Sequence, residues 1–369
     1  MTHMGSSPYM IDADITRART LPGAFYGDAA AFALARERVF ARSWQWLGDL
    51  GDVASPGTLS PRDLLPGFVD EPLLLARDGV GTLRCLSNVC THRGNILVKA
   101  PCRAKDIRCG YHSRRFDLAG RMTFMAEFAE AKDFPSASDH LPAVAFGEWA
   151  GHAFASLDPV APLAEFLGDM QASIASLPAD AMRLDAARGR DYTVNAHWAL
   201  YVENYLEGFH IPFVHAGLNE VVDYSAYRTD LHRWSNVQRA QSKDGAPAAQ
   251  YWWIFPNLML NFYPWGLSVN LVQPQALDRT RVIFRSYVRD AAKLGQGAGA
   301  ALDCVEAEDE AIVEAVQRGV RARLYTRGRY SPTRELGVHH FHRLLCAALC
   351  RETTTIPASP MRDDLQDLS

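Results

Sequence analysis

Two short segments pair a cysteine with a histidine at a spacing that could hold a metal centre. One residue separates Cys90 from His92, two separate Cys109 from His112, and 16 residues lie between the pairs. Structural zinc sites usually leave two to four residues between the members of a pair. A Rieske [2Fe–2S] cluster takes a cysteine for one iron and a histidine for the other from each loop. The pattern therefore favours a [2Fe–2S] cluster over zinc. The interpretation as a cysteine nucleophile with a histidine base is weaker still, because that chemistry needs one cysteine and one histidine and not two pairs.

A second group of candidate ligands lies in the segment 203–215. Glu207 and His210 are three residues apart and are expected on one face of a helix. Pro212 disfavours helical geometry at the residue before it, so we expect the helix to end near His210 and His215 to come from the turn beyond. Two histidines and one carboxylate form the facial triad of non-heme Fe(II) oxygenases. A zinc protease would instead carry its histidines four apart on one unbroken helix.

The carboxylate of such a triad must come from another part of the chain. The helix expected at 301–321 offers four candidates, which are Glu306, Glu308, Asp309 and Glu310. Most of these carboxylates are expected on a solvated helix face. Their spacing alone leaves the choice open.

The segments CTHRG and CGYHSRRFDLAG resemble the Rieske domain of the ring-hydroxylating, or Rieske non-heme iron, oxygenases. Ser113 and Arg114 stand where this family often has Gly-Trp, and Cys102 has no obvious loop partner. The extra disulfide of respiratory Rieske proteins has no counterpart, because Asn95 and Gly110 are not cysteines. Three longer segments look most like the choline monooxygenase branch, with its glycine betaine- and carnitine-oxidising relatives: FYGDAAAFALARERVFARSWQWLGD, YWWIFPNLMLNFYPWGLSVN and GRYSPTRELGVHHFHRLL.

This resemblance implies roles for individual residues. The implied cluster ligands are Cys90, His92, Cys109 and His112. The implied iron ligands are His210, His215 and Asp309, because the acid of the family precedes a stretch like EAVQRG; Glu308 is the second choice. The implied catalytic residues are Glu207 and Asn204.

Glu207 has a special place in this resemblance. In the family, an acidic residue three positions before the first iron histidine hydrogen-bonds that histidine and a cluster histidine of the neighbouring subunit. His112 of one subunit, with Glu207 and His210 of the next, would then form the electron path. A head-to-tail contact that closes makes a ring, so the resemblance implies a homotrimer. The alternative is that Glu207 only orients His210.

The resemblance implies an oxygenase component that uses O2, a [2Fe–2S] cluster and mononuclear Fe(II). No flavin or nicotinamide motif is found in the chain. Electrons from NAD(P)H would therefore arrive through a separate flavin and iron–sulfur reductase, with or without a ferredoxin. The implied reaction is hydroxylation or N-demethylation of a small quaternary or methylated amine. The alternatives are ring hydroxylation or O-demethylation of an aromatic acid, an electron carrier without oxygenase activity, and a zinc hydrolase.

Aromatic faces could hold a quaternary ammonium by cation–π attraction. The candidates are Trp252, Trp253, Phe255, Tyr263 and Trp265. Alternating aromatics on strands usually pack a core, so most of them are expected to be packing residues. Three histidines near the C-terminus are also expected to pack rather than to bind metal: His339, His340 and His342.

The whole chain sets limits on these interpretations. It has 369 residues, enough for about two domains. Its net charge of −4 gives no electrostatic reason to bind nucleic acid or an anionic membrane. We see no secretory signal and no membrane-spanning apolar run, and the seven cysteines do not suggest a disulfide framework. We therefore expect a cytoplasmic protein with reduced thiols that acts on a small molecule.

The helices and strands expected from the sequence, which must position these residues, indicate an α+β fold. A helical segment at 1–44 is expected to pack on the catalytic domain at 151–369, and residues 45–150 are expected to form an antiparallel-β Rieske domain. The catalytic domain should have a curved antiparallel sheet, and its helix-grip form is implied by the resemblance. Hairpin turns are predicted at Asp78-Gly79 and Ala119-Gly120. Further patterns predict helices at 28–41, 162–177, 199–210, 301–321 and 334–349, strands at 190–198 and 279–290, and two long strands within 251–272.

Overall fold

The computed structural model describes residues 9–177 and 179–350. The chain forms two compact units. The larger unit contains the described residues up to Ser43 and from Val160 onward, and the smaller unit contains Trp44–Pro159. Residues 1–8 of the predicted N-terminal segment and 351–369 of the predicted catalytic domain lie outside the described residues. No helix in the described ranges is long and apolar enough to cross a membrane.

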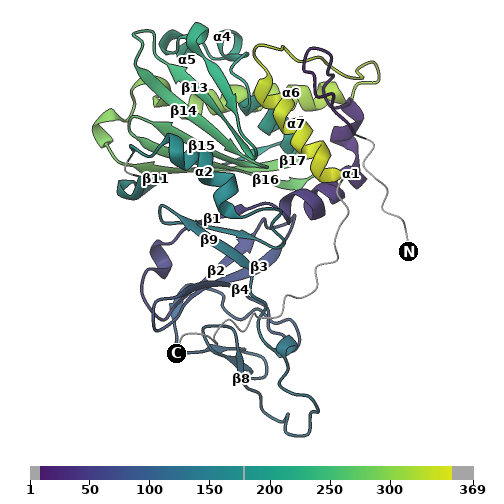
Figure 1. Cartoon of the computed structure of the whole chain (residues 1–369), viewed down its shortest axis with the longest axis vertical. Helices are drawn as coiled ribbons and strands as arrows, with labels where there is room; N and C mark the ends of the chain where they lie inside the picture. The colour runs from purple at the N-terminus through teal and green to yellow at the C-terminus, as the bar shows by residue number, and fades with distance from the viewer. Residues whose placement is uncertain (1–8, 178, 351–369) are drawn as a thin grey trace. The chain divides into compact units, whose positions relative to one another are not determined.

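The smaller unit consists of short antiparallel strands in three sheets (Figure 1). The sheets contain, in order, β1 (Gln45–Asp49), β10 (His152–Ser156) and β9 (Ala145–Trp149); β4 (Leu83–Ser87), β3 (Glu71–Arg77), β2 (Thr58–Leu64) and β5 (Cys102–Arg103); and β6 (Ile107–Arg108), β7 (Arg115–Phe116) and β8 (Met122–Phe124). The hairpins predicted at Asp78-Gly79 and Ala119-Gly120 are confirmed as β3–β4 and β7–β8.

One apolar core supports both candidate cluster loops. Cys90 follows β4, and Cys109 lies between β6 and β7. Both cysteines are buried in a cluster of apolar residues with Leu74, Leu86 and Phe116. Burial of this apolar surface stabilises the bases of the two loops. The two Cys/His pairs are therefore carried by the same core.

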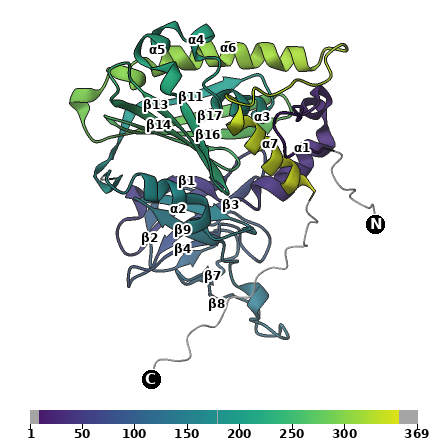
Figure 2. The same ribbon diagram turned by 45° about the horizontal axis from the view of Figure 1, so that its top comes forward.

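The larger unit is built around a curved antiparallel sheet of seven strands in the order β11-β17-β16-β15-β14-β13-β12 (Figures 1 and 2). The strands are β11 (Arg183–Val194), β12 (Arg228–Leu231), β13 (Ser235–Gln241), β14 (Pro247–Ile254), β15 (Leu258–Tyr263), β16 (Gly266–Ala276) and β17 (Arg279–Val288). The prediction of two long strands within 251–272 is wrong, because the chain reverses twice there. Pro256 and Pro264 lie in these reversals, where no ladder N–H is needed.

Helices in the larger unit agree with most of the predicted positions. α1 (Ala29–Ala35) continues into a π-helical segment at Arg36–Phe40, and the predicted helices further along the chain are α2 (Leu163–Ser173), α6 (Leu302–Val320) and α7 (Leu336–Leu349). Both views place α6 next to two short helices, α4 (Ile211–Val214) and α5 (Ala216–Val221) (Figures 1 and 2). This neighbourhood brings the acidic helix to the histidine segment.

The helix predicted at 199–210 is shorter than expected. It is present as α3 (Trp198–Tyr205), and α4 begins only after His210. The carboxylate of Glu207 accepts hydrogen bonds from the backbone N–H groups of Phe209 and His210, as a helix-capping side chain does. Glu207 and His210 therefore meet across a capped turn and not along a helix face.

Pro212 also behaves differently from the prediction. It lies in the first turn of α4, where the missing N–H has no helical partner to lose. The residue before it is accordingly helical, and His215 follows at the end of this short helix. Gly208 is required in the turn, because a Cβ there would lie 2.6 Å from the ring of Tyr227.

The histidines of α7 make packing contacts. His342 is fully buried, with Nδ1 2.6 Å from the hydroxyl of Tyr330 and Nε2 3.0 Å from Oε1 of Glu203. Nε2 of His339 lies 2.8 Å from the backbone oxygen of Asp12. These contacts tie α7 to α3 and to the N-terminal segment.

Candidate active site and cluster loops

Three predicted ligands converge on one point in the larger unit. Nε2 of His215 lies 3.1 Å from Oδ1 of Asp309 and 3.1 Å from Nε2 of His210. Nε2 of His210 lies 3.5 Å from the same carboxylate oxygen. Two imidazole nitrogens and one carboxylate oxygen, all within 4.8 Å of one another, are the donor set of a facial-triad iron site. The residues present therefore fit a mononuclear Fe(II).

The outer nitrogens of both histidines are held by carboxylates. Nδ1 of His210 lies 2.7 Å from Oε1 of Glu207, and Nδ1 of His215 lies 2.7 Å from Oε2 of Glu308. A carboxylate on Nδ1 sets the tautomer that leaves Nε2 free to bind a metal. Burial alone would lower the pKa of His215, but Asp309 and Glu308 outweigh it and raise that pKa. Glu308, the second choice for the third ligand, is thus placed on the far side of His215.

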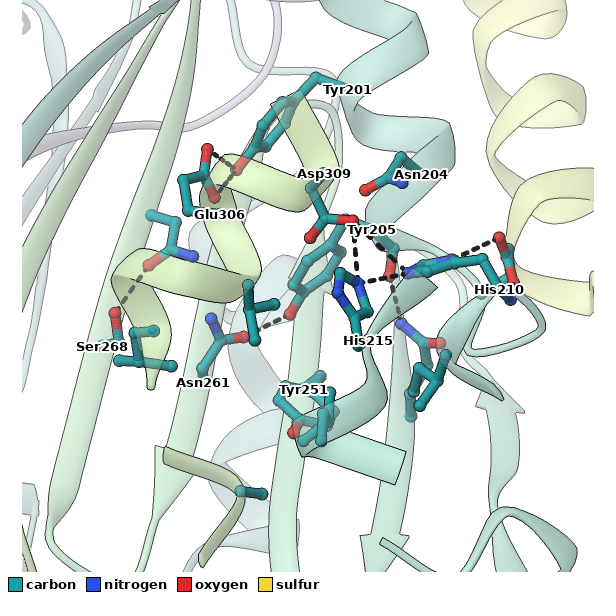
Figure 3. Close-up of a pocket in the computed structure, with 18 of the residues that line it drawn as sticks. Tyr201, Asn204, Tyr205, His210, His215, Tyr251, Asn261, Ser268, Glu306 and Asp309 are labelled. Atoms are coloured by element: carbon teal, nitrogen blue, oxygen red, sulfur yellow. Dashed lines mark hydrogen bonds and ion pairs between the residues drawn. The ribbon is translucent and has the colours of Figure 1, made fainter. Parts of the chain in front are cut away.

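A cavity of about 110 Å³ opens beside these residues (Figure 3). Two helices supply one wall. Tyr201, Asn204 and Tyr205 share a face of α3, and Glu306 and Asp309 share a face of α6, because residues three or four apart in a helix are neighbours. Asn204 therefore stands on the cavity wall close to the triad.

The sheet supplies the opposite wall through its register. Gln238, Tyr251, Asn261 and Ser268 lie directly opposite one another on β13, β14, β15 and β16. Residues paired in this way point to the same face of a sheet, and all four line the cavity. Tyr205 ties the two walls together, because its hydroxyl lies 2.6 Å from Oδ1 of Asn261.

Aromatic residues of the cavity are mainly tyrosines. They are Tyr201, Tyr205, Tyr227, Tyr251 and Tyr263, with Phe284. Burial is the first cause that raises the pKa of each of these tyrosines, so their phenols stay neutral. Of the five aromatic candidates only Tyr263 lines this cavity, and Trp252, Trp253, Phe255 and Trp265 are buried in the core, in agreement with the expectation that most of them are packing residues. Strand alternation turns Trp252 to the other face from Tyr251.

Glu306 is a further residue of this cavity. Only 5% of it is exposed, and the hydroxyl of Tyr201 lies 2.9 Å and 2.7 Å from its two carboxylate oxygens. Burial raises the pKa of Glu306 to about 8; the hydrogen bond from Tyr201 opposes this rise, and the charge of Asp309 adds to it. From the sequence, Glu306 was only one of four candidate iron ligands. Its place in the cavity could have been inferred from its spacing of three residues from Asp309, which puts both side chains on one helix face.

The smaller unit brings the four predicted cluster ligands together. The rings of His92 and His112 are 4.7 Å apart, and both cysteines are buried. Burial raises the pKa of Cys90. Burial alone would also raise the pKa of Cys109, but the backbone N–H groups of Tyr111 and His112 outweigh it and lower that pKa, which favours a thiolate at Cys109. Nδ1 of His112 is buried and has no hydrogen-bond partner among the described residues, so it is available as a ligand. The four residues therefore fit a [2Fe–2S] cluster.

Family models match both units. Residues 43–135 match the Rieske [2Fe-2S] domain, and residues 223–349 match the catalytic domain of the ring hydroxylating alpha subunit. The chain is 26% identical over 358 residues to the chloroplastic choline monooxygenase of Arabidopsis thaliana, covering 90% of this chain and 83% of the relative. It is 28% identical over 350 residues to the carnitine monooxygenase oxygenase subunit of Escherichia coli (strain K12), covering 88% and 92%.

Solved structures share the fold. The quaternary ammonium Rieske monooxygenase CntA in complex with L-carnitine superposes with a TM-score of 0.76 at 24% identity, covering 94% of this chain and 99% of that chain. Naphthalene 1,2-dioxygenase from Rhodococcus sp. gives a TM-score of 0.70 at 16% identity, covering 91% and 95%. The two family models support the Rieske interpretation over the zinc alternatives. With a Rieske domain and an oxygenase catalytic domain in one chain, the protein belongs to the Rieske non-heme iron oxygenases.

Proposed function

We propose that the protein hydroxylates or N-demethylates a small quaternary or methylated amine, such as a choline-, betaine- or carnitine-like compound. One observation carries this choice over an aromatic acid. The cavity beside the triad is lined by tyrosines and by three carboxylates, and no lysine or arginine is among its described lining residues. An aromatic acid would bring a net negative charge, with no cationic group, to a cavity lined by three carboxylates. A quaternary ammonium would meet negative charge and aromatic faces.

Glu306 is the carboxylate that can serve a cationic substrate. Glu207 and Asp309 are engaged with the two histidines, whereas Glu306 accepts its hydrogen bonds from the hydroxyl of Tyr201. With a pKa raised to about 8, Glu306 exists largely as the neutral acid near pH 7. An arriving cation favours the ionised form, since an opposite charge nearby stabilises a carboxylate. The site therefore acquires its counter-charge as the substrate enters.

The other residues of the site hold the metals, orient the metal ligands or exclude water. We assign His210, His215 and Asp309 as the iron ligands, and Cys90, His92, Cys109 and His112 as the cluster ligands. When bound, the iron supplies oxygen activation and the cluster supplies electrons. Glu207 and Glu308 orient the two histidines, and Asn204 offers a neutral amide for hydrogen bonding at the cavity wall. The buried tyrosines keep bulk water away from the substrate.

Electron delivery extends the proposal to other chains. Glu207 has its carboxylate on His210 in a turn flanked by Phe209 and Phe213, whose exposed fractions are 42% and 81%. The two rings lie 6.3 Å apart, and contiguous exposed apolar side chains mark interaction surfaces. We infer that a neighbouring subunit covers this turn and brings its His112 to Glu207, which makes a homotrimer. A separate reductase supplies the electrons.

A single-turnover experiment tests the proposed substrate class. The chemically reduced protein is given O2 with choline, glycine betaine or carnitine, and separately with benzoate or a methoxybenzoate, and products are read by mass. We expect an amine to gain one oxygen or to lose a methyl group as formaldehyde. The matched control is 3,3-dimethylbutanol, the uncharged carbon isostere of choline, which should react at least tenfold less well. Turnover of the aromatic acids alone would overturn the proposal.

A further inference from the structure

A buried arginine lies beside the cluster loops. Arg114 follows the second loop, and only 2% of it is exposed. Its backbone oxygen accepts a hydrogen bond from the N–H of Cys109 at 2.8 Å, so its position is tied to a cluster ligand. Its guanidinium lies 2.6 Å from Oδ1 of Asp139 and 3.2 Å from the backbone oxygen of the same residue. Arg114 therefore connects the second cluster loop to Asp139.

The first cluster loop is tied to the same residue. The hydroxyl of Thr91, which lies between Cys90 and His92, donates to the backbone oxygen of Asp139 at 2.8 Å. The carboxylate of Asp139 is itself held by the backbone N–H of Ser136 at 2.7 Å. Both ligand loops thus converge on one short turn. These contacts form a non-covalent clasp between the two loops, in a chain that lacks the disulfide of the respiratory proteins.

The charges of this ion pair are unequally exposed. The guanidinium of Arg114 stands 5.8 Å from the ring centre of Phe116 and 5.5 Å from that of Phe134, and its side chain is 2% exposed. The side chain of Asp139 is 20% exposed, so water screens its negative charge more strongly. The buried positive charge belongs to the residue that lies two positions after His112 and accepts the backbone hydrogen bond of Cys109. The less screened charge of the pair is therefore the positive one, and it is carried by the second cluster loop.

We propose that Arg114 and Asp139 are a positioning pair that clasps the two ligand loops and raises the reduction potential of the cluster. Reduction adds negative charge to the cluster, and a buried positive charge nearby stabilises the reduced state. Net charge is among the factors that set iron–sulfur potentials. This inference goes beyond the proposed function, because it holds whatever the substrate is. It also gives a role to Arg114, which departs from the pattern common in the family.

The test measures the midpoint potential of the cluster in the full-length, cluster-loaded protein by a redox titration followed by EPR. The variants are Arg114→Met, Arg114→Lys and Asp139→Asn. The control is Arg115→Met, which removes the same charge from the neighbouring exposed side chain. A second measurement follows the rate at which cluster absorbance is lost in the presence of a chelator.

We expect opposite shifts in potential from the two partners. Arg114→Met should lower the equilibrium constant for one-electron reduction about tenfold, which is 59 mV. Asp139→Asn should raise the potential, because it leaves the positive charge unbalanced. Arg114→Lys should keep the potential near that of the wild type, and Arg115→Met should leave it unchanged. Arg114→Met and Asp139→Asn should both lose the cluster faster than Arg115→Met.

Two results would overturn the proposal. Shifts of the same sign in Arg114→Met and Asp139→Asn would show that the potential follows general disruption and not charge. Equal rates of cluster loss in all variants would show that Arg114 and Asp139 do not hold the two ligand loops together. If Arg114→Met does not assemble a cluster, Asp139→Asn decides the electrostatic part: a raised potential supports it, and an unchanged or lowered one refutes it.

Discussion

Oε2 of Glu308 lies 2.7 Å from Nδ1 of His215, the ring nitrogen that faces away from the triad. This contact and the parallel contact between Glu207 and His210 leave both Nε2 atoms directed at Asp309. Adjacent residues of α6 therefore have different roles, since Glu308 orients a histidine and Asp309 completes the donor set. The structure thus gives a physical basis for choosing Asp309 over Glu308 as the proposed third ligand.

Replacing Glu308 with Ala should weaken iron binding without abolishing it. Loss of an orienting partner of a ligating histidine typically costs 10- to 100-fold in metal affinity. We expect a reduction of about that size in iron affinity, measured by competition with a chelator. Asp309→Ala should remove the iron altogether. Glu220→Ala, which changes an exposed carboxylate of α5, should behave as the wild type. Equal iron losses in Glu308→Ala and Glu220→Ala would contradict the orienting role.

Replacing Glu207 with Gln should separate metal binding from electron transfer. The amide oxygen of Gln can still accept the backbone N–H bonds that Glu207 holds, so the turn and the cluster should be retained. Iron affinity should fall no further than in Glu308→Ala, which also loses the partner of an iron histidine, so iron supplied in excess should still fill the site. Product formation in a single turnover with a reduced cluster should fall by orders of magnitude, because the proposed link between cluster and iron is broken. Iron content and cluster absorbance are measured on the same samples. Normal turnover would refute the bridge role.

Candidate ligand residues could be picked out from the sequence because metal chemistry restricts residue type and spacing. Cys90, His92, Cys109 and His112 stand out for that reason, and so do His210 and His215. The structure brings each of these sets together. The α+β fold and most helix positions follow from hydrophobic periodicity in the same direct way.

The cavity wall could not be predicted from local patterns. Tyr251 faces the cavity and Trp252 does not, and a shift of one residue in register would exchange them. Only the pairing of Tyr251 with Gln238 and Asn261 settles the face. The break after Tyr205 was missed for a related reason. After α3 ends, the carboxylate of Glu207 accepts the backbone N–H groups of Phe209 and His210, a side-chain contact that helix propensity does not encode.

Exposed apolar residues next to Glu207 should hold the proposed trimer together. Phe213→Asp places a charge on a side chain that is 81% exposed, so the isolated chain should fold normally. The buried subunit contact should instead be lost, and light scattering after gel filtration should show a shift from trimer to monomer. Val80→Asp is the control, because Val80 is also highly exposed but lies on a hairpin turn of the smaller unit. A trimer unaffected by Phe213→Asp would place the interface elsewhere.

Replacing Glu306 with Gln should weaken the binding of a cationic substrate selectively. Gln keeps the shape of the side chain and can still accept a hydrogen bond from Tyr201, but it cannot become negative. We expect KM for the amine to rise at least about tenfold, in keeping with the loss of a nearby opposite charge, while the weak reaction of the uncharged isostere changes little. Glu310→Gln is the matched control, since Glu310 lies one turn further along α6 and does not line the cavity. Equal losses for the charged and uncharged compounds would show a packing role.

His197 should make the larger unit sensitive to acid. Its ring is fully buried among aromatic residues, and burial lowers the pKa of His197 to about 3, against about 6.5 in an unfolded chain. Below pH 6.5 the unfolded chain binds a proton that the folded protein does not, so stability falls as the pH falls from 6.5 toward 3. Between pH 7 and pH 5 this costs about 2 kcal/mol. His197→Asn does not titrate, and Asn can still cap α3, where Nδ1 of His197 accepts the N–H of Ala199 at 3.2 Å. Urea unfolding measures the free energy of unfolding of the wild type and of His197→Asn at both pH values. From pH 7 to pH 5, the wild type should lose about 2 kcal/mol more of this free energy than the variant loses. A difference between the two proteins that does not depend on pH would mean that His197 is protonated in the folded state.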